Sequence, residues 1–599
     1  MALSLDQALK EAACAIDNKN KLRARRIYEK IIQGFPDNTE AMEGLKKLSQ
    51  DGTNVNPHPA LMESIGKLMR EDKHDLAIEE LEELIKEFPK SPNLQSMKGT
   101  CHARLKQGRL ASSSFNKALE INSRFLPAMM GMGALLMEND RYHPALEQYK
   151  RALEIDPNHL QANLQIGRCL LQIGHPFEAE SHIEKALKSA RRERPDITVA
   201  MANVYRDQDD FEKSREFFEK AIELQPENVG LLMNYANTLV VFGHSDEAET
   251  HLRKALSLDP SNTRTIRALA NVGVGLDDKN FADIIDAAQK QDNLSVEDAM
   301  HLHFALGSIL TKQKKYSEAF AHIEDGNYAR RNQYRYNFNR DTHVFSLLTK
   351  QFEKTPNVKF DYDEAPLGAK PIFVLGMMRS GTTMTEQVIS GHDKVSPRGE
   401  LEFLNRAVRG NINPNQNLDA EGLLKFRKSY INDISKLAIE TEYFTDKMPN
   451  NFRWVGYIIE AFPEAKIVHT VRDSRAVCWS IYKNFFAASG NGFAYNLDQL
   501  VDFYNLYTDH MKLMNITYPD RIFNLDYEKF VQSPDVEGKK LFKYLDLEWS
   551  DDLLDFKDAK RAVKTASTRQ VRNEIYKGSS KEWEPFTEFV KEAFDKLKA

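Results

Sequence analysis

Apolar residues follow two different patterns along this chain of 599 residues. In the first half they recur at three- and four-residue spacing, as in NHLQANLQIGRCLLQIGHPFEAESHIEKAL at residues 158–187. That spacing puts Leu, Ile and Phe on one face of each helix, and small Gly167 and Ala179 would lie where two helices cross closely. In the last third, short apolar runs such as PIFVLG predict buried strands. The pattern therefore predicts helix pairs followed by an α/β domain.

The helical pattern is also repetitive. The phrase ALEIDP ending at Pro157 recurs as AIELQP ending at Pro226, as ALSLDP ending at Pro260 and as ALEINS ending at Ser123. The steps from Pro89 to Ser123, from Ser123 to Pro157 and from Pro226 to Pro260 are each 34 residues. A fixed period of this length is typical of stacked helix–turn–helix units, which bury a shared core between neighbours.

The period, together with the small and aromatic residues of each unit, resembles the tetratricopeptide repeat. We expect an all-α tetratricopeptide-repeat array at residues 1–275 and a degenerate helical repeat at 276–335, which includes HLHFALGSILTKQKKYSEAFAHIEDGN at 301–327. A linker is expected at 336–370. The resemblance implies a concave surface that binds a protein or peptide, while a role as scaffold or dimerisation element alone is the alternative.

Composition narrows the function classes. A chain of this length exceeds a single hydrophobic core, so at least two domains are expected. The formal net charge is -6, which gives no general attraction to nucleic acid or to a membrane surface. The four cysteines are scattered without a C-x-x-C pair, and no apolar run is long enough to span a membrane. We expect a cytoplasmic protein with no membrane span and no nucleic-acid partner.

A predicted phosphate-binding loop opens the last third. The strand PIFVLG runs into GMMRSGTT at residues 376–383 and then into the helical stretch MTEQVISGH. Strand, glycine-bounded loop and helix point backbone N–H groups at an anion. Gly376-x4-Gly381 matches a nucleotide-binding P-loop, but Thr382-Thr383 replaces the lysine and hydroxyl that a nucleoside triphosphatase needs. Arg379, backbone amides and threonine hydroxyls suit a donor with fewer charges, and a degenerate ATPase is the alternative for this loop alone.

A second motif contains another strand followed by a helix. AKIVHTVRDSRAVCWSIYKNFF places Arg472 at the carboxyl end of a predicted strand and Ser480 eight residues later. Both side chains can reach one anion at the edge where open α/β sheets bind ligands. For a lone arginine, pairing with Asp473 or a distant carboxylate would be the ordinary interpretation. The loop upstream makes anion binding the favoured one.

Residues 371–599 thus resemble the sulfotransferase family, in particular its tyrosylprotein sulfotransferase-like branch. The resemblance implies an α/β, P-loop-like domain with a parallel sheet that uses 3′-phosphoadenosine 5′-phosphosulfate (PAPS) as donor, without a metal. By the family pattern, the 5′-phosphosulfate end is bound by Arg379, Ser380, Gly381, Thr382 and Thr383. Arg472 and Ser480 correspond to the residues that bind the 3′-phosphate.

The resemblance also implies catalytic roles. Glu400, in a Gly-Glu pair 21 residues beyond Arg379, corresponds to the base. Glu402 competes for that role, and helix capping or a salt bridge to Arg398 is the structural alternative for Glu400. Lys447 corresponds to the lysine that steadies the bridging oxygen. Cytosolic small-molecule sulfotransferases carry a basic histidine two residues later, where this chain has Pro449, and this favours Glu400.

Three further positions match the family near the C-terminus. Tyr527 corresponds to a tyrosine near the adenosine, Ser567 to a serine beside the transferred group and Lys581 to a residue of the loop that closes over the nucleotide. The last match departs from the family, which has a glycine and then a basic residue directly before the tryptophan, where this chain has Lys581-Glu582. His392 and His469 are expected to be structural.

Taken together, the residues predict an enzyme that transfers a sulfonate from PAPS to a hydroxyl acceptor. A protein or peptide tyrosine is the first choice of acceptor, with the repeats recruiting the substrate or a partner. A sugar or small phenol, or a non-catalytic repeat scaffold, are the alternatives. In this hypothesis Glu400 accepts the proton, and Arg379, Lys447 and Ser567 hold the developing charge.

Overall fold

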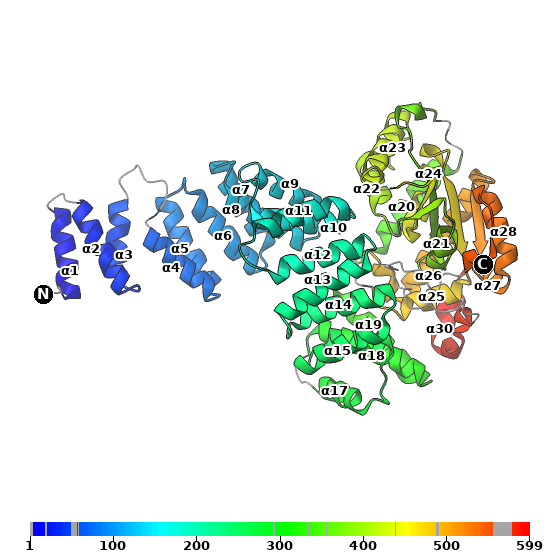
Figure 1. Cartoon of the computed structure of the whole chain (residues 1–599), viewed down its shortest axis with the longest axis horizontal. Helices are drawn as coiled ribbons and strands as arrows, with labels where there is room; N and C mark the ends of the chain where they lie inside the picture. Colours follow the sequence, from blue (N-terminus) through cyan, green and yellow to red (C-terminus); the bar gives the residue numbers. More distant parts are fainter. Residues whose placement is uncertain are drawn as a thin grey trace. The chain divides into compact units, whose positions relative to one another are not determined.

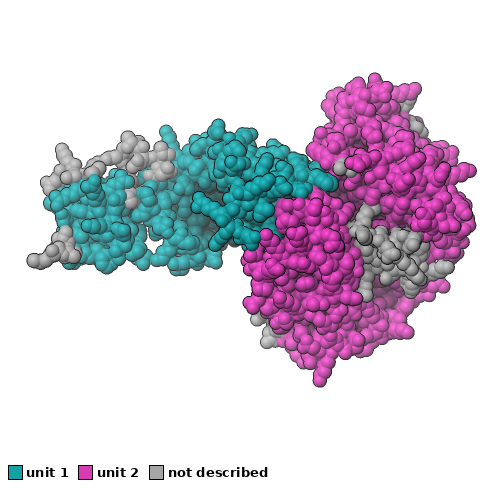
Figure 2. Space-filling view, in the orientation of Figure 1, with its two compact units in different colours: residues 1–200 teal, residues 201–599 magenta. Residues whose placement is uncertain are grey.

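The computed structural model describes residues 4–17, 21–49, 57, 59–290, 294–333, 336–354, 356, 358–437, 439–486, 490–554 and 578–598. The chain forms two compact units, residues 1–200 and 201–599, which Figure 2 colours separately. Among the described residues no helix is both long and apolar enough to cross a membrane.

The first unit consists of helices packed as successive pairs (Figure 1). These helices are α1 (Leu5–Asp17), α2 (Lys21–Gly34), α3 (Thr39–Ser49), α4 (Pro59–Arg70), α5 (His74–Glu87), α6 (Pro92–Arg104), α7 (Gly108–Ile121), α8 (Leu126–Glu138), α9 (Tyr142–Leu153), α10 (Leu160–Gln172) and α11 (Pro176–Ser189). A Cβ atom added to Gly167 of α10 would lie 2.3 Å from Ile183 Cγ1 and 3.3 Å from the carbonyl oxygen of Ala179 in α11. The predicted close crossing at Gly167 and Ala179 is therefore confirmed.

Helix α12 (Pro195–Asp207) spans the boundary of the two units, and helical pairs continue in the second unit. The repeat helices there are α13 (Phe211–Leu224), α14 (Val229–Phe242), α15 (Ser245–Leu258), α16 (Thr263–Val272), α17 (Lys279–Gln289), α18 (Val296–Lys312) and α19 (Tyr316–Gln333). Each repeated proline lies in the turn ahead of a new pair. After Pro226 and Pro260, the side chains of Asn228 and Asn262 cap α14 and α16 by accepting hydrogen bonds from the N–H groups of Leu231 and Thr265.

The segment expected as a linker contains α20 (Phe338–Phe352) and a short 3-10 turn, η1 (Tyr362–Glu364). Phe352 at the end of α20 is fully buried against Tyr457 and Tyr518 of the following domain. The segment thus contributes to the core of the second unit.

The C-terminal domain is built on five parallel strands in the order β2-β3-β1-β4-β5. They are β1 (Lys370–Gly376), β2 (Val395–Pro397), β3 (Tyr443–Asp446), β4 (Lys466–Val471) and β5 (Ile522–Asp526). Helices cover both faces, so β1 and β3 are buried almost throughout, as expected of a parallel sheet. Ile372 and Val374 of β1 pack with Val468 and Leu525, while Phe373 on the opposite face contacts Tyr430.

The remaining helices of this domain connect and cover the strands. They are α21 (Thr382–Ser390), α22 (Phe403–Asn411), α23 (Ala420–Ile434), η2 (Pro449–Trp454), α24 (Val455–Ala461), α25 (Ser474–Tyr482), η3 (Gly492–Tyr495), α26 (Leu497–Thr517), α27 (Tyr527–Gln532), α28 (Pro534–Leu545), η4 (Asp551–Leu554), η5 (Ser579–Lys581), η6 (Glu584–Phe586) and α30 (Thr587–Phe594). The predicted fold class, helical repeats followed by an α/β domain with a parallel sheet, is confirmed.

Within the second unit the last repeat pair packs directly on the α/β domain. Phe320 of α19 stacks on Phe589, with ring centroids 4.7 Å apart, and on Trp479 of α25. The buried Asn327 side chain donates a 2.9 Å hydrogen bond to the carbonyl oxygen of Tyr482. Aromatic stacking and a satisfied buried amide make a tight junction. Helices α18 and α19 are therefore part of the same packed body as the sheet.

Candidate active site

Each of the five parallel strands is followed by a predicted site residue, and these residues lie at one edge of the sheet. Gly376 ends β1 beside Thr470 of β4, and Val471 of β4 lies beside Asp526 of β5. The carboxyl ends of parallel strands share one edge, and β1 lies where the winding of the sheet reverses, with β3 on one side and β4 on the other. That reversal leaves a crevice in which α/β proteins bind ligands.

The loop after β1 has the backbone of an anion site. Gly376 and Gly381 have φ values of +146° and +108°, and Arg379 is also left-handed at +69°. A Cβ atom on Gly376 would lie 2.6 Å from the carbonyl oxygen of Thr470, so only glycine fits. Gly381 then caps α21, whose first residues are Thr382 and Thr383. The first N–H groups of a helix have no acceptor within the helix itself, and the helix dipole favours an anion at this end.

The structure brings Arg379, Arg472 and Ser480 together. Arg379 Nε donates to Ser480 Oγ at 2.9 Å, and Arg472 Nη1 donates to the carbonyl oxygen of Arg379 at 2.9 Å. Removal from water, and then the nearby charge of Arg472, lower the pKa of Arg379 to about 10. A polyvalent anion bound beside both guanidinium groups would stabilise the charged form of Arg379.

Tyr527 closes the other side of the loop. Its ring would be 2.5 Å from a Cβ atom on Gly381, and the guanidinium carbon of Arg472 lies 4.6 Å from the ring centroid. Ser580, which the sequence analysis missed, accepts a 3.3 Å hydrogen bond from Arg472 Nε and donates to Glu528 at 2.6 Å. Lys581 is exposed and does not line the cavity described below, whereas its neighbour Glu582 lines that cavity and forms an ion pair with Lys483.

Glu400 and Lys447 form an ion pair in which Lys447 Nζ donates to Glu400 Oε1 at 2.6 Å. Lys447 follows β3 and is fully buried, whereas the side chain of Glu400 is 37% exposed. The N–H of Lys447 also donates to the carbonyl oxygen of Gly399 at 2.9 Å, which fixes the Gly-Glu pair against the end of β3. A half-exposed carboxylate is therefore held beside a buried ammonium at the strand edge.

Two buried carboxyl groups support this pair, and the sequence analysis missed both. Glu386 of α21 accepts hydrogen bonds from the N–H of Gly399 at 2.9 Å and from Thr445 Oγ1 at 2.8 Å. Asp446, directly before Lys447, accepts from Tyr430 Oη at 2.9 Å and from Asn451 Nδ2 at 3.1 Å. Burial raises the pKa of Asp446 to about 8. A carboxyl group within the buried helix TTMTEQVIS was the one sequence signal for Glu386.

The other predicted residues have contacts of their own, separate from the Glu400–Lys447 ion pair. Glu402 accepts a hydrogen bond from Asn405 at 3.0 Å. His469 is buried in β4 between Asn524 and Tyr507, and burial lowers its pKa to about 4. His392 lies in the turn after α21 and contacts Asp393. Ser567 lies outside the described residues.

A cavity of about 1530 Å³ borders Glu400 and the loop after β1 at residues 376–383. We call this loop the donor loop, after the donor that the sequence predicts there. One side is formed by the α/β domain, including Arg379, Thr382, Glu400 and Asn450. The opposite side is formed by repeat helices α14, α16, α18 and α19, and we call this surface the repeat wall. It includes Asn237, Arg264, Arg267, Asn271, Phe304 and Thr311.

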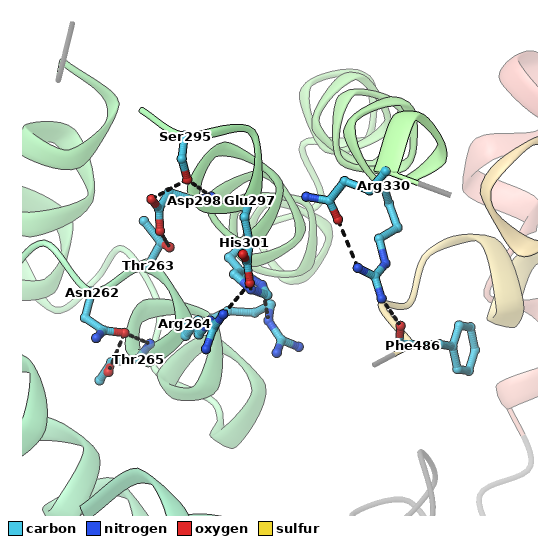
Figure 3. Close-up of polar contacts among 12 residues, drawn as sticks. Asn262, Thr263, Arg264, Thr265, Ser295, Glu297, Asp298, His301, Arg330 and Phe486 are labelled. Atoms are coloured by element: carbon cyan, nitrogen blue, oxygen red, sulfur yellow. Dashed lines mark hydrogen bonds and ion pairs between the residues drawn. The ribbon is translucent and has the colours of Figure 1, made fainter. Parts of the chain in front are cut away.

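Polar contacts and one aromatic ring fix the repeat wall (Figure 3). Thr263 Oγ1 and Ser295 Oγ donate to Asp298 at 2.8 and 2.6 Å, which joins α16 to α18. Arg330 donates to the carbonyl oxygen of Phe486 at 3.2 Å in the α/β domain. The guanidinium carbons of Arg267 and Arg330 lie 4.3 and 4.8 Å from the centroid of the Phe485 ring. The wall and the domain opposite it are thus physically joined.

Asp446 gives the site a pH signature. Because its pKa is raised in the folded protein, the folded state binds a proton that the unfolded chain releases, so stability falls as pH rises from about 4 to about 8. Asp446→Asn should remove this dependence, up to about 1.4 kcal/mol per pH unit. Denaturant unfolding at pH 5, 6.5 and 8 measures it. Parallel profiles for variant and wild type would show that Asp446 is ionised throughout.

Comparisons with known proteins agree with this organisation. The sulfotransferase family matches residues 371–551, and the tetratricopeptide repeat matches residues 64–91, 136–204 and 205–272. These matches cover the sheet with its donor loop and the helical pairs before it.

Some similar proteins match most of this chain, and others match about a third of it. An uncharacterized protein of Aquifex aeolicus is 27% identical over 561 residues, which cover 87% of this chain and 72% of that protein. A protein-tyrosine sulfotransferase of Drosophila melanogaster is 26% identical over 197 residues, 31% of this chain and 39% of that protein. Protein-tyrosine sulfotransferase 1 of Danio rerio is 25% identical over 222 residues, 35% of this chain and 60% of that protein. This chain thus carries tetratricopeptide repeats followed by a domain of the sulfotransferase family.

Proposed function

We propose that the protein transfers a sulfonate group from PAPS to the hydroxyl group of a protein or peptide tyrosine. The observation that carries the proposal is the single cavity that borders the donor loop, Glu400 and the repeat wall together. A phosphosulfate donor at the loop and a hydroxyl acceptor beside Glu400 would meet there. The two reactants would be held at one sheet edge, which supplies the proximity that a bimolecular transfer needs.

The residues around the loop fit the donor. The N–H groups at the start of α21 and the side chains of Arg379, Thr382 and Thr383 would hold the 5′-phosphosulfate. Arg472 and Ser480 would hold the 3′-phosphate by turning from Arg379, which they contact in the free protein. Tyr527 would lie against the adenosine, as its ring already covers Gly381. An anion between Arg379 and Arg472 would offset the burial and the nearby charge of Arg472, which together lower the pKa of Arg379.

In the transfer step the acceptor oxygen forms a bond to sulfur while the bond from sulfur to the bridging phosphate oxygen breaks. Glu400 takes the proton of the acceptor hydroxyl. The bridging oxygen leaves as part of adenosine 3′,5′-bisphosphate and gains negative charge, which the ammonium of Lys447 stabilises. Arg379 and the helix start stabilise the sulfonate oxygens. No step requires a redox partner.

The ion pair between Glu400 and Lys447 gives this mechanism an order. In the free protein the ammonium of Lys447 occupies one carboxylate oxygen of Glu400 at 2.6 Å. When the donor's bridging oxygen takes over Lys447, that oxygen of Glu400 becomes available to an acceptor hydroxyl. The base is thereby released where the donor is bound, which favours transfer to the acceptor once the donor is in place.

The size of the cavity and its second wall support a peptide acceptor. Small-molecule sites occupy roughly 300–1,000 Å³, and this cavity of about 1530 Å³ leaves room for a chain segment beside the donor. Asn237, Asn271 and Thr311 of the repeat wall offer polar groups to such a segment. A sugar or small phenol would use the α/β side alone and is the alternative. A non-catalytic scaffold would leave the arrangement of Glu400 and Lys447 without a purpose.

Glu400→Gln should lower kcat by about 10²- to 10⁴-fold, the range of lost general-base catalysis, with donor binding retained. Glutamine keeps an oxygen that can accept a hydrogen bond from the buried Lys447, whereas alanine would leave that ammonium without an acceptor as well as without a counter-charge. Glu402→Gln, in the same cavity, is the matched control. Single-turnover transfer of labelled sulfonate measures the effect, and unchanged turnover would remove Glu400 from the mechanism.

Arg472→Ala should weaken binding of adenosine 3′,5′-bisphosphate by about 1.5 to 3 kcal/mol for each charged hydrogen bond lost. Calorimetry measures the affinity. Arg475→Ala is the control, because Arg475 lies over the Trp583 ring at 5.2 Å and has no predicted role at the donor. Equal affinity of Arg472→Ala and wild type would contradict the assignment of the 3′-phosphate.

Asn237→Trp should distinguish the acceptors. Asn237 is exposed in the repeat wall, so a bulky side chain would narrow the cavity opposite the donor loop. We expect KM for a tyrosine peptide to rise about 5- to 100-fold, equivalent to 1 to 3 kcal/mol of steric cost, with KM for a small phenol unchanged. Lys254→Trp, on an exposed position of α15 away from the cavity, is the control. An unchanged peptide KM would place the acceptor on the α/β side alone.

A further inference from the structure

A cluster of metal-binding side chains lies in the last repeat pair, away from the donor site. It comprises His303 of α18 with His322 and Asp325 of α19. The two Nδ1 atoms are 2.9 Å apart, and His303 Nδ1 lies 3.8 Å from Asp325 Oδ2. The three ligand atoms all lie within 4.8 Å of one another. None of the three residues borders the catalytic cavity.

The three residues lie on two closely packed helices, α18 and α19. A Cβ atom on Gly307 of α18 would lie 2.7 Å from Ile323 Cγ1 of α19, and one on Gly326 would lie 3.4 Å from His303 Cβ. These two glycines let the helices approach closely on both sides of the imidazoles. Because α19 is also fixed to the α/β domain through Asn327, the positions of the three ligands are set by helix packing rather than by a loop.

The protonation states suit a metal as well. Burial lowers the pKa of both His303 and His322, although Asp325 acts in the opposite direction on each. Imidazoles bind metal ions in their neutral form, and the Asp325 carboxylate is exposed and accessible to an ion. In the free protein one imidazole Nδ1–H donates to the other Nδ1, a contact that a cation would replace.

We propose that His303, His322 and Asp325 bind a divalent transition-metal ion such as Zn²⁺ with two nitrogen ligands and one oxygen ligand. Ligand atoms at Zn²⁺ bond lengths of about 2.0–2.1 Å in a tetrahedron are separated by about 3.3 Å. The observed 2.9 and 3.8 Å lie on either side of that value and the third separation is within 4.8 Å, so side-chain rotations would bring the three atoms to an ion. Two imidazoles favour Zn²⁺, Co²⁺ or Ni²⁺ over Mg²⁺ and Ca²⁺, which prefer all-oxygen sites.

The consequence of binding would be mechanical. The ion would tie α18 to α19 next to Phe304 and Ile323, which line the catalytic cavity. It would therefore brace the repeat wall without touching the reacting sulfonate. The test of the metal site is independent of the proposed transferase activity, because metal binding is measured with no donor or acceptor present.

Calorimetric titration of the chelator-treated full chain with Zn²⁺, and the visible spectrum with Co²⁺, test the proposal. We expect one tight equivalent, a tetrahedral Co²⁺ band, a higher Tm with Zn²⁺ and no competition from excess Mg²⁺. His322→Ala and Asp325→Asn should each weaken binding at least about 10- to 100-fold, the loss caused by outer-shell changes alone. His343→Ala, an exposed histidine of α20, is the matched control and should bind as wild type does.

Asp325 is exposed, so its substitution tests the site even where loss of a histidine disturbs the helix pair. Absence of a tight equivalent would overturn the proposal. Equal affinity of Asp325→Asn, His322→Ala and wild type would overturn it too, since the ion would then be bound by other histidines or by cysteines. Displacement of Zn²⁺ by Mg²⁺ would likewise contradict a nitrogen-rich site.

Discussion

The site depends on one topological constraint, the position of β1 at the centre of an all-parallel sheet. From β1 the chain passes to β2 at one edge of the sheet and returns to β3 beside β1; it then forms β4 on the other side of β1 and β5 at the far edge. The loops after β1 and β4 therefore separate and leave a crevice between them. Arg379 lies on one of these loops and Arg472 on the other, and their contact closes the base of the crevice. Glu400 and Lys447 follow the neighbouring strands β2 and β3. They lie at the same edge of the sheet because parallel strands end at a common edge.

Much of this could be predicted from the sequence, because the site residues are local to recognisable elements. The glycines around Arg379 and the strand before Arg472 are visible as short patterns, and the register of the sheet then brings them together. Glu386 and Asp446 could not be found in this way. Their partners, such as Thr445 for Glu386 and Tyr430 for Asp446, come from other elements, and a buried carboxyl group acquires its role only from such partners.

The junction of the repeats with the sheet was equally hidden in the sequence. The 34-residue period identifies helix pairs but says nothing of the partners of their outer side chains. Phe320 and Asn327 look like ordinary members of a degenerate repeat, yet one stacks on Phe589 and the other bonds to the backbone of Tyr482. As a result residues 201–333 share a compact unit with the α/β domain, whereas the sequence pattern alone groups them with the preceding repeats.

This junction also couples the repeat wall to the donor site through a short length of chain. Ser480, which contacts Arg379, and Phe485, whose ring contacts Arg267 and Arg330, are five residues apart. The last turn of α25 and the residues after it are thus bound at both ends. Each of the two guanidinium groups makes a cation–π contact with the Phe485 ring, which holds the ring to the repeat helices. A movement of the repeat wall would therefore shift the segment that carries Ser480. A movement of the donor loop would shift the segment that contacts Arg267. The same chain segment therefore contacts both walls of the cavity, so the repeats and the α/β domain share one packed boundary.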